Sequence, residues 1–249
     1  HIQVQTASET HLSRSLGATN QIAYLNLREY TTVSADRVRD DYTSLVSAGS
    51  GGSGGVILDL RQNGGGSLSG AWNLTDFLGP SSVDNQIMFS LQQQSQGFDY
   101  RFGVYGSNLG IIDPSKFVIL IDSSSASASE LTSAALKDLG IATLMGGQSY
   151  GKGVGQNVVG LLDGSGAYIT SFELLSPLGN SWHNLGVSPD YPLSTALPAT
   201  PTDDTLLQAA IDFIETGSVS QATTSRRTTK SPLLLSVPPY SCLLYTSPS

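Results

Sequence analysis

Short apolar runs alternate along this chain with stretches in which apolar residues recur at helical spacing. Four runs are typical of β-strands, and the last three are apolar enough to be buried on both faces. They cover residues 22–27, 55–60, 117–121 and 141–145. A helical pattern follows each of the first three runs. This repetition of strand, turn and helix predicts an α/β fold whose chemistry lies in the turns after the strands.

The remaining pattern predicts four helices and one β-hairpin. Ser34 is suited to cap the first helix, and Gly140 is suited to end the third. The predicted helices contain residues 34–46, 68–78, the stretch that ends at Gly140, and 203–215. Apolar runs at 154–162 and 167–175 flank the turn at 163–166, which predicts a hairpin. The Gly/Ser-rich segment 49–55 is expected to be a flexible connection.

Composition narrows the class of protein. The chain has 249 residues, 39% of them apolar, which suffices for one sizeable core. Its 12 basic and 20 acidic residues give a net charge of −8, which argues against nonspecific nucleic-acid binding. No apolar run approaches the roughly 18 residues needed to span a bilayer. A single cysteine, Cys242, excludes an internal disulfide scaffold and a Cys-rich zinc site, and three scattered histidines form no metal cluster.

Both ends of the chain are expected to lie outside the core. Because the sequence starts at His1, residues 1–20 are interpreted as the remnant of an upstream region. Residues 217–241 are Ser/Thr/Pro-rich and predict a flexible tail, which leaves 21–216 as the folded core. Residues 242–249 resemble one reading frame of a transposase adapter used in sequencing libraries. An ordinary disordered tail is the alternative interpretation of these last residues.

Three turns after predicted strands carry unusual residues. In the glycine turn, Asp59–Gly66, three successive glycines let backbone N–H groups face a ligand, although a tight turn alone would also need them. In the serine turn, Ser123–Glu130, a serine at a helix start is suited to act as a nucleophile. The spacing of Ser127 and Glu130 also fits a capping box, which needs no catalysis.

The third, the lysine turn, is Gly146–Gly153. Lys152 is the only lysine set between glycines. A lysine kept from water has a lowered pKa and can accept a serine proton, whereas a lysine on a surface loop cannot.

Two other motifs overlap the lysine turn. Gly146 to Lys152 fits a P-loop without its last position, because Gly153 stands where a Ser or Thr would hold magnesium. Ser149 lies in a G-x-S-x-G elbow, with Asp163 and His183 following in hydrolase order. Both motifs require a helix after the turn, whereas residues 154–162 are β-branched and interrupted by glycine. Neither motif is favoured, and His183 is interpreted as a polar loop residue.

The three turns together, in this order, resemble the carboxyl-terminal processing peptidases, also called tail-specific proteases. The resemblance runs from about Gln21 to Glu215. Its motifs are the segment ILDLRQNGGG at 57–66, SASASE at 125–130 and YGKG at 150–153, followed by SPLG at 176–179 and GVSPD at 186–190. The resemblance implies an α/β fold of the crotonase/ClpP-like spiral type, with a single catalytic core.

The resemblance also implies the roles of individual residues. The nucleophile falls on Ser127 and the general base on Lys152, with Gln156 at a position that orients the lysine in related enzymes. The oxyanion hole falls on the backbone amides of Ala128 and Gly65, with Gly66 as a neighbour. Asp138 matches an acidic position that is sometimes implicated, although a surface role at a helix end is favoured.

The resemblance therefore implies a serine endopeptidase that acts on peptides or unfolded proteins through a Ser/Lys dyad and an acyl-enzyme, without metal or organic cofactor. Gly64 stands where many relatives have proline, and no PDZ-like module is expected in residues 1–20, so tail specificity is not assumed. A non-catalytic protein that binds hydrophobic ligands or peptides on the same fold is the alternative. Low charge and high Ser/Gly/Thr content are compatible with export to a periplasmic or extracellular compartment.

Overall fold

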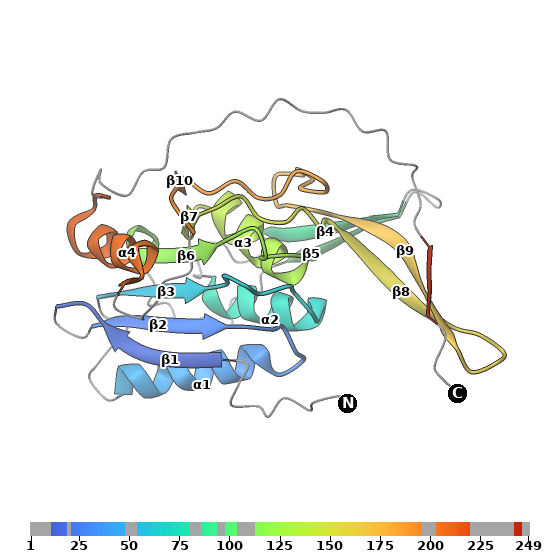
Figure 1. Cartoon of the computed structure of the whole chain (residues 1–249), viewed down its shortest axis with the longest axis horizontal. Coiled ribbons are helices and arrows are strands. Elements are labelled where there is room, and N and C mark those ends of the chain that lie inside the picture. Colours follow the sequence, from blue (N-terminus) through green and yellow to red (C-terminus); the bar gives the residue numbers. More distant parts are fainter. Residues whose placement is uncertain are drawn as a thin grey trace.

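A computed structural model of the chain describes residues 11–18, 21–47, 54–79, 86–93, 98–103, 113–195, 203–219 and 242–245. Its centre is a six-stranded sheet in the order β1-β2-β3-β6-β7-β10 (Figure 1). The strands are β1 (His11–Leu16), β2 (Ile22–Leu27), β3 (Gly55–Asp59), β6 (Phe117–Ile121), β7 (Thr143–Gly146) and β10 (Tyr191–Pro192). Strand β1 is antiparallel to β2, and every other pair in this sheet is parallel.

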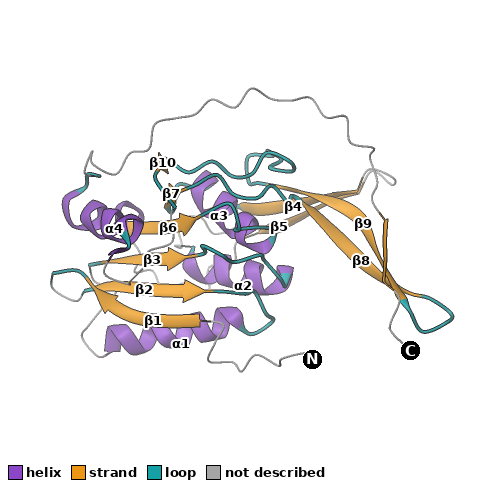
Figure 2. Ribbon diagram, in the orientation of Figure 1, coloured by secondary structure: helices purple, strands orange, loops and turns teal. Residues whose placement is uncertain are grey.

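Four helices pack on the two faces of this sheet. They are α1 (Ser34–Ser47), α2 (Leu68–Leu78), α3 (Ala128–Asp138) and α4 (Thr205–Thr216), and a short 3-10 turn, η3 (Pro114–Lys116), precedes β6. Strand β2 shows the division, because Ala23 and Leu25 join the core that contains α1, α2 and α3. Its alternate residues Ile22 and Tyr24 join the core that contains α4. Figure 2 accordingly shows α4 apart from the other three helices.

A second, antiparallel sheet extends from one side of the body. Its order is β11-β9-β4-β5, with β8 paired to the other edge of β9. The strands are β4 (Ile87–Gln93), β5 (Phe98–Gly103), β8 (Val154–Gly160), β9 (Gly166–Leu175) and β11 (Cys242–Tyr245). Strands β8 and β9 and the turn between them, residues 154–175, form a long hairpin that projects away from the body (Figure 1). We refer to residues 154–175 as the hairpin arm.

The structure confirms the predicted α/β class, the four helices, the hairpin and the buried strands. Strand β7 begins two residues later than expected, at Thr143. Five strands were not predicted from the pattern, namely β1, β4, β5, β10 and β11. Strand β1 shows that residues 11–16, expected to precede the core, pair with β2. Most of the segments 49–55 and 217–241 lie outside the described residues, whereas residues 242–245 form β11.

Candidate active site

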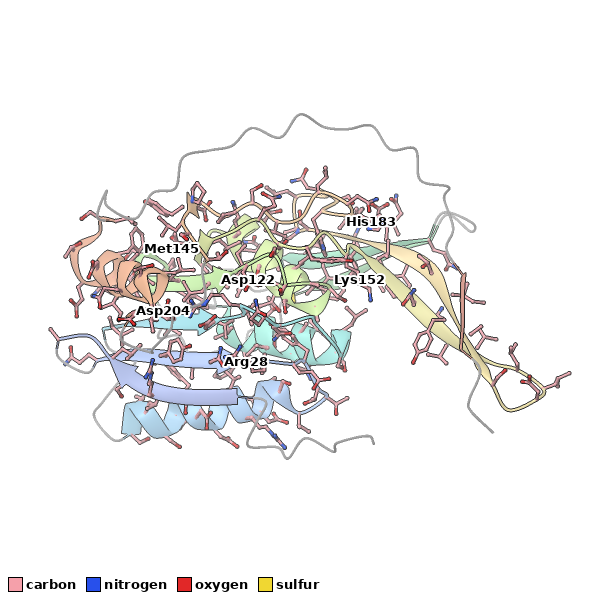
Figure 3. The ribbon with its side chains drawn as sticks, in the orientation of Figure 1. Arg28, Asp122, Met145, Lys152, His183 and Asp204 are labelled. Carbon is pink, nitrogen blue, oxygen red and sulfur yellow. The ribbon has the colours of Figure 1, made fainter. Side chains whose placement is uncertain are left out.

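The three turns singled out in the sequence meet at one edge of the central sheet. Asp59 is paired with Leu120, and Ile121 with Gly146, so β3, β6 and β7 end side by side. Because these strands are parallel, the chain leaves all of them in the same direction, into the glycine, serine and lysine turns. Figure 3 labels Asp122, which directly precedes the serine turn, and Lys152 of the lysine turn.

Asn63 holds the glycine turn against its neighbours. This side chain is fully buried, donates to the Leu27 carbonyl oxygen at 2.8 Å, and accepts from the Gly65 N–H at 2.9 Å. Its backbone oxygen accepts from the Ala126 N–H at 3.0 Å and from Ser129 Oγ at 2.9 Å. One residue therefore connects β2, the glycine turn and the serine turn. The sequence pattern gave Asn63 no special role.

Burial separates Ser127 from the other serines of the serine turn. Ser125 and Ser129 are fully buried, and their hydroxyls donate to the carbonyl oxygens of Leu60 and Asn63, respectively, at 2.9 Å. Ser123 and Ser124 are exposed, whereas Ser127 is half-buried. Ser127 also has φ 55° and ψ −112°, a conformation that non-glycine residues rarely adopt. Such strained backbone is typical of functional sites when the surroundings hold it in place.

Glu130 joins the serine turn to the lysine turn. Its carboxylate is fully buried, and one oxygen, Oε2, accepts from the N–H groups of both Ser127 and Lys152, each at 2.8 Å. The other oxygen, Oε1, accepts from Ser149 Oγ and from the Gly151 N–H, each at 2.6 Å. The backbone nitrogens of Ser127 and Lys152 are therefore at most twice 2.8 Å apart.

Glu130 has the predicted capping contact and, in addition, contacts with the lysine turn. Its contact with the Ser127 N–H is the one that a capping box requires at the start of α3. The three contacts with the lysine turn depend on a segment about twenty residues further along the chain, which the local motif does not reveal. The motif therefore fits a cap and a functional site at once.

The backbone of the lysine turn is fixed on both sides. Tyr150 N–H donates to the Ser125 carbonyl oxygen at 3.0 Å, and Asn184 N–H donates to the Gly151 carbonyl oxygen at 2.8 Å. Gly151 has φ +97°, which a residue with a Cβ rarely adopts. Lys152 is half-buried, and within the described part of the chain no carboxylate forms an ion pair with its amine. The lysine is thus positioned through its backbone while its amine stays available.

The glycine turn lies directly against the start of α3. A Cβ placed on Gly65 would be 2.8 Å from Ser127 Cβ and 3.0 Å from the Ala128 nitrogen. Ala128 is the first residue of α3, where backbone N–H groups have no acceptor within the helix. A Cβ on Gly66 would lie 2.1 Å from the Tyr30 carbonyl oxygen, so only glycine fits there. Gly65 and the Ala128 amide are therefore close to Ser127, although the Gly65 N–H donates to Asn63.

Two further predicted residues lie beyond the turns. Gln156 is on the strand that follows the lysine turn, and Asp138 is on the helix that follows the serine turn. Gln156 is half-buried on β8, at the point where the register between β8 and β9 shifts after Gly155. Irregularities of this kind redirect a side chain and are common beside active sites. Asp138, the last residue of α3, accepts a hydrogen bond from Ser176 Oγ, which fastens the loop after β9 to the helix.

The two competing motifs fail in the structure. Ser149 is only 6% exposed, and its hydroxyl donates to Glu130 and accepts from the Val187 N–H. Asp163 lies in the turn at the tip of the hairpin arm, where it accepts from Ser165. Ser149 therefore cannot form a triad with Asp163. The P-loop interpretation is also wrong, because β8 follows the lysine turn where that motif requires a helix.

Behind the glycine turn lies a buried network of charges. Arg61 donates to both oxygens of Asp59 and, as a fork, to both oxygens of Asp204 at 2.9 and 2.7 Å. Burial opposes ionisation of Asp204, but hydrogen bonds from Arg61 and from the Leu207 N–H outweigh it and lower the pKa of this carboxyl. Burial, with Asp59 beside the hydroxyl, raises the pKa of Tyr24, which donates to Asp59 at 2.8 Å. The network anchors the start of α4 to the end of β3.

No group of three or more His, Cys, Asp or Glu side chains among the described residues is arranged to hold a metal ion. Likewise, no helix in the described part of the chain is both long and apolar enough to cross a membrane.

Two relatives of this chain carry the names of processing peptidases. The chain is 32% identical over 186 residues to the chloroplastic C-terminal processing peptidase of Tetradesmus obliquus, covering 75% of this chain and 38% of the relative. It is 31% identical over 205 residues to the carboxyl-terminal-processing protease of Synechocystis sp., covering 81% and 45%. The chain thus spans less than half the length of these relatives.

A solved structure and a family model agree with these relatives. The structure of a photosystem II D1 C-terminal processing protease matches with a TM-score of 0.64 and 28% identity, covering 83% of this chain and 53% of that one. The model of peptidase family S41 matches residues 21–193. That match includes the glycine, serine and lysine turns, so the chain belongs to peptidase family S41.

Proposed function

We propose that this protein is a serine endopeptidase in which Ser127 is the nucleophile and Lys152 the general base. The observation that carries the proposal is the shared contact with Glu130 Oε2, which accepts from the backbone N–H groups of both residues. A nucleophile is activated when its base is held beside it in a fixed geometry. Membership of peptidase family S41 supports the same reaction class.

The proposed reaction is acyl transfer in two steps. The neutral amine of Lys152 accepts the proton of Ser127 Oγ, and Oγ forms a bond to the carbonyl carbon of the scissile peptide. The C–N bond then breaks, and Lys152 returns the proton to the leaving amine. Water, deprotonated by Lys152, attacks the acyl-enzyme and releases the acid with Ser127 regenerated. Gln156, on the strand after the lysine, is proposed to orient the Lys152 amine.

The negative charge that develops on the carbonyl oxygen needs preorganised donors. Ala128 N–H is proposed as the first donor, because it lies at the positive end of α3 next to Ser127. The second donor is proposed to be Gly65 N–H, with Gly66 as its neighbour. Since Asn63 Oδ1 accepts from Gly65 N–H, an oxyanion there would share or replace this side-chain contact.

Hydrolysis of an unfolded, fluorescently labelled protein tests the proposal. Ser127→Ala and Lys152→Ala should each lower kcat/KM by on the order of 10³-fold or more. The matched control is Ser123→Ala, an exposed serine in the same turn, which should leave hydrolysis unchanged. Undiminished cleavage by either dyad variant would show that the dyad is wrong. Absence of cleavage in all proteins would instead favour the alternative of a non-catalytic peptide- or ligand-binding protein.

We further propose that the substrates are peptides or unfolded proteins and that the protein works after export. The relatives support the first part, since they are named as processing peptidases and proteases. Low charge, with 13% Asp, Glu, Lys and Arg, is compatible with export but does not require it. Fractionation of cells that make the whole protein tests the second part. A protein confined to the cytoplasm would contradict it.

A further inference from the structure

The hairpin arm exposes apolar side chains on both of its faces. Val158 and Tyr168 are directly opposite each other on one face, and 64% and 47% of their surfaces are exposed. Val159 and Ile169 lie on the other face, and each is 43% exposed. A two-stranded hairpin is only marginally stable in water, and exposed apolar surface of this kind marks binding sites. The arm is therefore suited to receive a further strand.

One edge of β9 offers a place for that strand. Strand β8 pairs with β9 along almost all of its length, from Gly166 to Glu173. On the opposite edge, β4 pairs only with residues 173–175, at the end nearest the body. The outer half of this edge, from Gly166 to Ile169, extends beyond β4. Unpaired N–H and C=O groups along such an edge form a template for an added strand.

A segment of this chain shows what the edge accepts. Residues Cys242–Tyr245 form β11, antiparallel to β9, with Cys242 opposite Ile169 and Tyr245 opposite Gly166 (Figure 1). The segment reads Cys-Leu-Leu-Tyr, so it has neither charge nor proline. The arm has matching chemistry, because Asp163 is the only charged residue between positions 154 and 172. Whatever the origin of residues 242–249, their pairing identifies the edge as a strand acceptor.

We propose that the outer edge of β9, Gly166–Ile169, is a binding site for an extended, uncharged apolar segment of an unfolded polypeptide. The segment adds to the sheet as an antiparallel strand, so main-chain hydrogen bonds provide affinity and the apolar faces of the arm select the sequence. In the orientation of β11, the amino end of the bound segment points toward β4 and its carboxyl end toward the tip of the arm.

The site has a consequence for the proposed reaction. The arm begins at Val154, directly after Lys152 and Gly153, so a polypeptide held on β9 is tethered near the lysine turn. Tethering raises the local concentration of a substrate without any new contact at the reacting bond. This consequence rests on the proposed peptidase function, whereas binding of the segment to the edge does not.

Binding of a peptide to an inert protein tests the site without relying on hydrolysis. The protein is Ser127→Ala shortened to end at residue 241, and the probe is fluorescent Ser-Ser-Leu-Leu-Tyr-Thr, which is residues 241–246 with serine for Cys242. Fluorescence anisotropy should show saturable binding. The unshortened Ser127→Ala protein should bind more weakly, because its own β11 occupies the edge.

Three comparisons separate strand addition from general apolar adhesion. Ile169→Lys should weaken binding about tenfold or more, since a lysine on an edge opposes strand pairing. The control Leu162→Lys changes an exposed leucine at the tip, off the edge, and should have no effect. The same peptide with alternate backbone nitrogens methylated keeps its side chains but loses donors, and should not bind. Equal binding of the methylated peptide, equal weakening by both lysines, or no binding at millimolar peptide would overturn the proposal.

Discussion

The three turns at the sheet edge and the hairpin arm differ in two respects. They differ in how far their side chains are buried and in which contacts hold them in place. In the turns, Asn63 and Glu130 are completely buried, and each binds backbone groups of two separate segments. In the arm, by contrast, the apolar side chains of Leu162 and Val158 are largely exposed. One region is held by tertiary hydrogen bonds and the other mainly by pairing within a hairpin.

This difference matches the different tasks proposed for the two regions. Catalysis needs groups held within fractions of an ångström, which buried and fully hydrogen-bonded turns provide. Binding of varied polypeptides needs accessible apolar surface and open backbone groups, which the arm provides. Substitutions of the buried, hydrogen-bonded residues of the turns should therefore cost stability and activity together, whereas substitutions at the tip of the arm should leave both nearly unchanged.

The largest loss of stability is expected from Arg61→Met. The substitution leaves Asp59 and Asp204 buried without their cation, and removal of one partner from a buried pair typically costs about 3–5 kcal/mol. Urea unfolding measures the effect. The control is Arg39→Met, whose pair with Asp36 is exposed and should be worth about 1 kcal/mol or less. Similar losses in the two variants would mean that the Arg61 network does not hold the fold.

A smaller loss of stability, with a larger loss of function, is expected from Glu130→Gln. The amide keeps the size of the carboxylate but places its own N–H groups against backbone donors, and a hydrogen bond to a charged group is worth about 1.5–3 kcal/mol. Unfolding free energy and hydrolysis are measured on the same protein. Glu215→Gln, which changes an exposed contact with the Ala18 N–H, should change neither. Full activity in Glu130→Gln would contradict the positioning role of Glu130.

Acid should weaken the attachment of α4 to the end of β3. The folded pKa of Asp204 is lowered below its ordinary value of 3.8, chiefly by Arg61 acting against burial. Its contribution to stability is therefore fully present above pH 3.8 and is lost as the pH falls through the folded pKa. Asp204→Asn should flatten this acid dependence in unfolding measured between pH 5 and pH 2. An unchanged acid slope in that variant would refute the assignment.

The smallest effect is expected at the tip of the arm. Leu162→Ser removes an exposed side chain that contributes nothing to either core, so the unfolding free energy should stay within about 0.5 kcal/mol of the parent. Thermal unfolding measures it. A loss as large as that in Glu130→Gln would show that the arm is part of the cooperative core, which would remove the contrast between the two regions.

Periodicity was sufficient for the strands and helices with the clearest apolar patterns. Strand β3 and strand β6 are apolar at almost every position, and α4 alternates between buried and exposed residues as an amphipathic helix does. The missed strands have mixed patterns. Strand β1 reads His-Leu-Ser-Arg-Ser-Leu, β4 ends in Gln92 and Gln93, and β5 contains Asp99 and Arg101. Polar residues suit strands at or near a sheet edge, but they also suit loops, so the pattern alone does not distinguish them.

Part of the candidate site could be predicted from the sequence. Ser127, Lys152 and the glycine turn follow strands, and a parallel sheet brings the ends of adjacent strands together. The contacts of Asn63 with Leu27, and of Glu130 with Gly151, join segments that are distant in sequence. No local motif encodes such contacts, because they depend on the strand order of the folded sheet. The positive φ of Ser127 is likewise not indicated by any local motif.

Covalent labelling tests the central claim, that Ser127 is activated by Lys152, without depending on a substrate. The protein is incubated with a fluorophosphonate, and the adduct is located by mass spectrometry of its peptides. We predict a single adduct on Ser127, absent in Ser127→Ala, much slower to form in Lys152→Ala and unchanged in Ser123→Ala. An adduct on another serine, or labelling of Ser127 at an undiminished rate in Lys152→Ala, would contradict the account.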